Sequence, residues 1–260
     1  GNYVMDGAMN GAVGNTAVGH QALGSVTTSD YNTALGGWAL DALTTGTINI
    51  GIGINALGTH TTGDRNIAIG NDSMFNTDAG SNSLGSTENI FIGHGSGGGD
   101  WADTASNCNV GVGNYVMDAA MDGATYNTAV GYQALTGLTS GDSNVALGYL
   151  TLRDMSSGSN QVAIGHGAGK QQTTGGGNVL IGKDAAGIDS SSSNVIIGTS
   201  AFSSANNSSS GNNVMVGNEA GVSINGANST DNVILGSGAG YGGGAEFTEN
   251  IAIGSNALNS

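Results

Sequence analysis

A nine-residue pattern organises the chain, and residues 127–135 (Asn-Thr-Ala-Val-Gly-Tyr-Gln-Ala-Leu) are a clear copy of it. A variant returns fourteen times, each opening on Asn, or once on Gln161, and reaching a Gly four residues later. The spacing between copies is most often 17 residues and ranges from 16 to 23. Such short-period self-similarity is typical of solenoids, in which each repeat stacks on the next. We expect an all-β parallel β-solenoid of about fourteen coils that forms a single domain over 1–260.

The three residues between the Asn and the Gly predict a short β-strand. The first is always Thr, Ile or Val, and the third is always Val, Ile or Leu, which gives one apolar face at period two. We interpret this face as the interior, so that the middle residue points outward. Since the middle residue is also apolar in every copy, the outward face predicts contact with a second copy of the chain. The largest middle residues, expected at the subunit interface, are Phe91, Leu180, Ile196, Met215 and Ile234.

The residues that follow the Gly predict the return of the coil. Two variable positions come first, then a small residue and often a large apolar one, as in 131–135. We expect a second short strand here, with the Gly in a tight or positive-φ corner between the two strands. The repeated Asn predicts a ladder of side-chain amides that bond along the stacking direction.

Composition and charge limit the classes of partner that we expect for this chain. The chain has 49 Gly, no Pro and only 9% charged residues, whereas about a quarter of the residues of an ordinary domain are charged. The net charge of −15 repels phosphate backbones, so we expect no nucleic-acid partner. No apolar run approaches the ~20 residues of a membrane span, so we expect no membrane insertion. The solitary Cys108 predicts no disulfide framework.

The same pattern disfavours enzyme chemistry. The glycines recur with the repeat and therefore answer to backbone geometry, and Asp and Glu do not recur on a strand face. His20, His94 and His166 each follow the Gly directly. If this position faced a threefold axis, each would form a trio of His side chains able to hold a metal ion. Ile54 and Lys183 take that position in other copies, which favours an exposed variable site. We expect no catalytic, metal or cofactor site.

Two connections are longer than the others, at 75–88 and 98–108, and each carries an aromatic residue. Phe75 and Trp101 are therefore candidate receptor-binding residues, because an aromatic ring in a surface loop offers an apolar face on which a sugar can stack. The alternative is that both connections are tolerated insertions at the outer edge. Trp38 lies within the repeat itself, and we expect it to pack.

The first residues begin in the middle of a repeat. Residues 1–23 agree with 113–135 at 18 of 23 positions, so that Gly1 corresponds to the closing Gly of a coil. The last residues follow a complete unit, whereas the terminal repeats of a finished solenoid are normally atypical. We therefore expect the chain to be a fragment of a longer fibre.

The units at 15–23, 127–135, 144–152 and 250–258 resemble the head repeats of trimeric autotransporter adhesins and, more closely, repeats of phage tail-fibre proteins. The resemblance implies a left-handed β-roll and a homotrimer. It implies the structural and adhesive shaft of a fibre in the virion tail, which projects or forms a surface for a cell-surface glycan or protein receptor. The alternatives are the extracellular head of a bacterial surface adhesin and a polysaccharide-degrading tailspike. The adhesin unit is typically shorter than 17 residues, so the coils here carry longer loops.

Overall fold

The computed structural model describes residues 1–77, 85–187, 190–203, 210–222, 224, 229–241 and 248–259. In these ranges the chain is an all-β parallel solenoid in which each coil contributes one three-residue strand, and no described residue is helical. The predicted all-β parallel solenoid is confirmed. Part of the long connection at 75–88, residues 78–84, lies outside the described residues.

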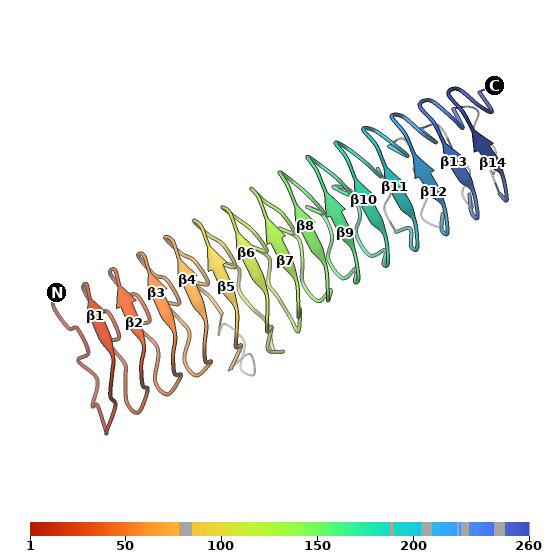
Figure 1. The fold of residues 1–260 in the computed structure, drawn as a ribbon. Coiled ribbons are helices and arrows are strands. Elements are labelled where there is room, and N and C mark those ends of the chain that lie inside the picture. Colours follow the sequence, from red (N-terminus) through yellow and green to blue (C-terminus); the bar gives the residue numbers. More distant parts are fainter. Residues whose placement is uncertain are drawn as a thin grey trace. The chain divides into compact units, whose positions relative to one another are not determined.

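The coils group into two compact units, 1–133 with 138–140 and 134–137 with 141–260. The strands of each unit point the same way in Figure 1. The first unit carries β1 (Thr16–Val18), β2 (Thr33–Leu35), β3 (Ile50–Ile52), β4 (Ile67–Ile69), β5 (Ile90–Ile92), β6 (Val110–Val112) and β7 (Thr128–Val130). The second unit carries β8 (Val145–Leu147), β9 (Val162–Ile164), β10 (Val179–Ile181), β11 (Val195–Ile197), β12 (Val214–Val216), β13 (Val233–Leu235) and β14 (Ile251–Ile253).

Within each unit, successive strands pair in parallel and in register. In the first unit Phe91 of β5 pairs with Gly111 of β6, and in the second Ile196 of β11 pairs with Met215 of β12. The same register holds from β1 to β7 and from β8 to β14. Equivalent positions of neighbouring repeats therefore form continuous rows of side chains.

The strand faces are the reverse of those expected from the sequence. The middle residue of nearly every strand is buried inside its own coil, and the first and third residues are half-buried or exposed. The prediction that the large middle residues lie at a subunit interface is therefore wrong. All of them have no solvent-exposed surface in the single chain: Phe91, Leu180, Ile196, Met215 and Ile234.

Matched side-chain volumes explain how a narrow coil interior accepts either a small or a large middle residue. The residue six positions after the middle residue is large where the middle one is small, and small where it is large. Ala34 and Gly51 are followed by Leu40 and Leu57, whereas Phe91, Met215 and Ile234 are followed by Gly97, Gly221 and Gly240. A Cβ atom on Gly221 would stand 2.5 Å from Met215 Sδ, and one on Gly97 would stand 2.9 Å from Phe91 Cδ1. There are two exceptions, Ala163 followed by Gly169 and Ile196 followed by Phe202.

The segment after the closing Gly is a turn, so the predicted second strand is wrong. The closing glycines have φ between 121° and 145°, as predicted for the corner, and a Cβ atom on Gly93 would clash with the carbonyl oxygen of Gly113. The second and fourth residues after the Gly also have positive φ, for example Trp38 at 56° and Leu40 at 53°. This strained geometry persists because their N–H groups bond neighbouring coils, as Leu40 N–H bonds Ala56 O at 2.9 Å.

The predicted Asn ladder is confirmed within each unit. Asn109 Oδ1 accepts both the backbone N–H and the side-chain amide of Asn127, each at 3.0 Å. Asn109 Nδ2 also donates to Ala124 O at 2.8 Å, near the end of its own coil. Gln161 keeps the pattern, since its Oε1 accepts the N–H of Asn178 at 3.2 Å. One buried amide thus closes its own coil and binds the next.

Exchanging the two volumes in the coil of β12 tests the interior assignment. Met215→Ala alone should lower the free energy of unfolding by about 2–5 kcal/mol because it leaves a cavity. Gly221→Leu alone should lower it by about 1–3 kcal/mol through overpacking. The double variant recreates the Ala34 and Leu40 combination and should lose clearly less than the two single losses combined, measured by urea unfolding. Strictly additive losses would contradict the pairing.

Candidate functional site

No helix in the described ranges is long and apolar enough to cross a membrane. Among the same residues, no three His, Cys, Asp or Glu side chains come together to hold a metal ion. His20, His94 and His166 are exposed at the corner that follows the closing Gly, as expected for a variable surface position. The chemistry of the chain therefore has to be sought on its surface rows.

The corner after the closing Gly carries an aromatic row in the first unit. The His20 ring lies edge-on to Trp38 at 5.1 Å between centroids and to Tyr3 at 6.0 Å. Further along, Tyr115 meets His94 at 5.1 Å and Tyr132 at 6.0 Å. Such rows arise because the backbones of stacked coils are only ~4.8 Å apart in the stacking direction, so the corner residues of one coil reach those of the next.

The second unit has its own, shorter version of this row. The rings of Tyr149 and His166 stack with their centroids 4.9 Å apart. His166 Nδ1 lies 3.8 Å from Asp184 Oδ1, and both side chains are largely exposed. A salt bridge this exposed stabilises little.

Trp38 belongs to this surface, where it packs against the ring of His20. It is 42% exposed, at the second position after the closing Gly, whereas Leu40 two residues later is buried. The indole Nε1–H donates to Gln21 Oε1 at 2.6 Å, which fixes the ring against the preceding coil. Trp38 thus presents a fixed ring to solvent.

Two neighbouring depressions open on this corner in the first unit, and we call them the corner site. The larger has a volume of about 450 Å³ and the smaller about 180 Å³. Trp38, Asp41, Asn55, Gly58, Thr59 and Phe75 line the larger depression. Tyr3, Asp6, Gln21, Gly24, Ser25 and Asp41 line the smaller. Asp41 therefore lies between them and borders both.

The groups of the larger depression are held by the stacked backbone. Phe75 is partly exposed and rests on Gly58, where a Cβ atom would stand 3.0 Å from two ring carbons. Thr59 Oγ1 donates to the carbonyl of Phe75 at 2.7 Å, and Asn55 Nδ2 donates to Asp72 Oδ1 at 2.9 Å. Partial burial raises the pKa of Asp41, and the positive charge of His20 opposes this rise.

Trp101, the other candidate receptor-binding residue, lies inside the chain. It has no exposed surface, its Nε1–H donates to Gly97 O at 3.1 Å, and its ring lies 5.9 Å from that of Phe91. The long connection at 98–108 therefore folds back over the coil to bury this ring. A residue without exposed surface cannot contact a receptor, so this prediction is wrong for Trp101, whereas Phe75 lines the corner site.

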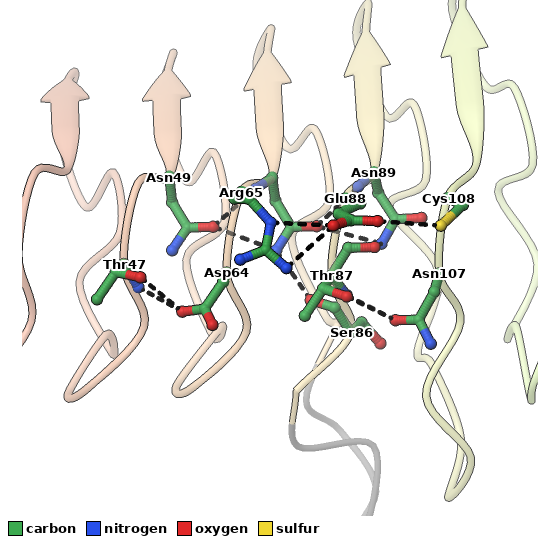
Figure 2. A network of polar contacts seen from close by, with 11 residues as sticks. Thr47, Asn49, Asp64, Arg65, Ser86, Thr87, Glu88, Asn89, Asn107 and Cys108 are labelled. Carbon is green, nitrogen blue, oxygen red and sulfur yellow. Dashed lines mark hydrogen bonds and ion pairs between the residues drawn. The ribbon is translucent and has the colours of Figure 1, made fainter.

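A polar network joins successive coils of the first unit at the start of the strands, the opposite end from the closing glycines (Figure 2). Arg65 Nη2 lies 3.0 Å from Glu88 Oε1, and the Cys108 thiol donates to Glu88 Oε2 at 3.4 Å. Asp64 Oδ1 accepts the N–H of Thr47 at 2.7 Å. Figure 2 shows this polar network beside the buried Asn ladder. Charged side chains outside and amides inside therefore connect the same coils.

The second unit has a different depression of about 360 Å³, lined by Ser190, Ser191, Ser192, Ser193, Ser210, Gly211, Asn212 and Thr230. The buried hydroxyls of Ser191 and Ser210 make no hydrogen bond with the residues that the structure describes. Since its lining holds neither an aromatic ring nor a charged group, it offers less for recognition than the corner site. We therefore take the corner site as the candidate functional site.

Comparisons with protein-family models, with curated proteins and with solved structures find no match to this chain.

The thiol of Cys108 tests the polar network. Burial and the neighbouring Glu88 raise the pKa of Cys108, and the charge of Arg65 opposes them. At pH 8 iodoacetamide should therefore alkylate Cys108 more slowly than a free cysteine, since the thiolate is the nucleophile. Glu88→Gln should accelerate the reaction severalfold, and Arg65→Gln should slow it. Equal rates in all three proteins, measured by mass spectrometry, would contradict the network.

Proposed function

We propose that the chain is a structural and adhesive fibre segment, a homotrimeric shaft of the phage tail-fibre kind located in the virion tail. In this proposal the coils are left-handed, and the shaft projects or forms a surface for attachment to a host. The observation that carries the proposal is an apolar stripe on the outer face of the strands. The stripe consists of the first and third residues of β1–β7 in the first unit and of β8–β14 in the second.

The outer stripe is apolar although much of it faces solvent in a single chain. Val18 is 57% exposed, Leu35 48% and Leu147 45%. Contiguous exposed apolar surface on a soluble protein normally marks an interaction site. A strand that is apolar on both faces is likewise normally covered on both. The stripe therefore supports contact with a partner along the strands.

The period of the stripe favours a second copy of the same chain as this partner. Each coil adds two side chains to the stripe, both of them Val, Ile or Leu except in β1, β2 and β7, where the first is Thr. The in-register pairing keeps these pairs aligned along each unit. A partner with the same coil spacing can match every pair, whereas a globular surface would match only a few. The resemblance to trimeric fibre and adhesin repeats suggests three chains, with their stripes facing a common axis.

The head of a bacterial trimeric surface adhesin is the second candidate, because the same stripe would serve it equally well. The exposed aromatic rings at the corner site favour an adhesive role in either case. Both candidates differ from a polysaccharide-degrading tailspike, which would need a pair of carboxyl groups about 5–10 Å apart across a substrate cleft.

The mass of the purified chain in solution tests the trimer. Light scattering should give about 76 kDa, three times the 25.4 kDa of one chain. Leu35→Asp combined with Leu147→Asp should yield a species of one-chain mass with an unchanged circular dichroism spectrum, because both side chains point outward.

Ile48→Asp is the matched control. Ile48 is 52% exposed and precedes Asn49, so it is not one of the strand residues that form the stripe, and this variant should remain trimeric. A wild-type chain of one-chain mass, or equal disruption by Ile48→Asp, would contradict assembly through the stripe.

A further inference from the structure

We propose that the corner site binds a neutral oligosaccharide, with adjacent sugar units in its two depressions. The biological meaning of this site rests on the adhesive function proposed above, although its chemistry does not.

The larger depression combines the two elements that sugar recognition requires. The partly exposed Phe75 and the 42% exposed Trp38 offer apolar ring faces, on which the C–H face of a pyranose can lie. Asp41, Asn55 and Thr59 supply oxygen and nitrogen atoms along the same walls. The site is an open depression of about 450 Å³ that combines aromatic walls with a few polar groups, as small-molecule sites do.

The charges of the lining select among sugars. Asp41 borders both depressions and Asp6 borders the smaller one, whereas neither lining contains Lys or Arg. The net charge of the whole chain is also negative, at −15. Both features repel uronic acids, sialic acids and phosphorylated sugars, while a carboxylate is a strong acceptor for neutral hydroxyl groups. A neutral glycan therefore fits better than an acidic one.

The position of Asp41 between the depressions favours an oligomer over a single sugar. Gly24 and Gly58 line the smaller and the larger depression and lie two coils apart, at roughly 10 Å along the stacking direction. Gln21 lines the smaller depression and also holds the Trp38 indole at 2.6 Å, so one hydrogen bond links the walls of both. A chain of sugars along the corner would contact both depressions, and Asp41 would reach two successive units.

The site is also prepared before any ligand binds. The N–H of Thr59 donates to Phe75 O at 3.1 Å, and the N–H of Ala42 donates to Gly58 O at 3.2 Å. Neighbouring coils thus fix the walls through backbone bonds, which lowers the entropy cost of ordering them on binding.

Tryptophan emission of the full chain provides the assay. Trp101 is buried, so Trp38 reports on the site. The chain is titrated with neutral oligomers of glucose, galactose, mannose and N-acetylglucosamine, and with oligogalacturonate as an anionic counterpart. At least one neutral series should change the Trp38 emission saturably, and its trisaccharide should bind more tightly than its monosaccharide. Oligogalacturonate should not bind.

Variants then locate the binding. Phe75→Ala should weaken binding roughly tenfold, and Asp41→Asn should weaken it severalfold. Tyr132→Ala removes an exposed ring of the same aromatic row that lines neither depression, and it should bind like the wild type. Trp38→Phe removes the fluorophore but keeps an aromatic ring in the site. This variant should lose the emission change and still bind the sugar, as detected by saturation-transfer NMR.

Three results would overturn the proposal: no neutral sugar affects the emission, only the anionic oligomer binds, or Phe75→Ala binds as tightly as the wild type. Light scattering on the same samples tests the homotrimer independently of sugar binding. A trimer that binds no neutral sugar removes the glycan site alone, and a single chain that binds through Phe75 removes the trimer alone.

Discussion

The structure depends on the buried ladder of asparagine amides. Every coil must satisfy its backbone donors against the neighbouring coils, and an unpaired buried polar group costs about 1–3 kcal/mol. In the first unit Asn109 meets this need in both directions, because its amide nitrogen bonds Asn89 Oδ1 at 3.1 Å and its oxygen accepts from Asn127. The positive-φ corners and the glycine row are tolerated because the stack that the ladder maintains fixes the chain on both sides. The fold is therefore a consequence of stacking rather than of intrinsic strand propensity.

Stacking in register also determines what the surface can do. One position of the repeat becomes one row of side chains, so a single residue preference produces a feature as long as the unit. The first and third strand positions give the apolar stripe that we propose for trimer contact. The positions after the closing Gly give the aromatic row, from which Trp38 and the nearby Phe75 form the walls of the corner site. The proposed trimer contact and the proposed binding site thus lie on different parts of the coil.

The sequence predicted the repeat, the strands, the glycine corner and the Asn ladder, because each follows from residue type at a fixed spacing. It did not predict the strand faces, because all three strand positions are apolar and hydrophobicity alone cannot distinguish inside from outside. A usable signal was present in the opposite volumes of Met215 and Gly221, which recur in other coils. Trp101 was misassigned because its burial depends on the path of a long connection, which places its ring against Phe91. Residue type and loop length do not reveal that path.

Hydrogen exchange on Asn109→Ala tests most directly whether the buried amide ladder holds the coils together. The change removes the acceptor for the N–H of Asn127, at 3.0 Å, and the bond to Ala124 O. We expect amides in 124–130 to lose protection by about 1–3 kcal/mol, with little change in distant coils. Asn109→Gln is the control and should retain most protection, since Gln161 fills this position in the native chain. Unchanged protection in Asn109→Ala would contradict the account, because the stack would then be maintained without its ladder.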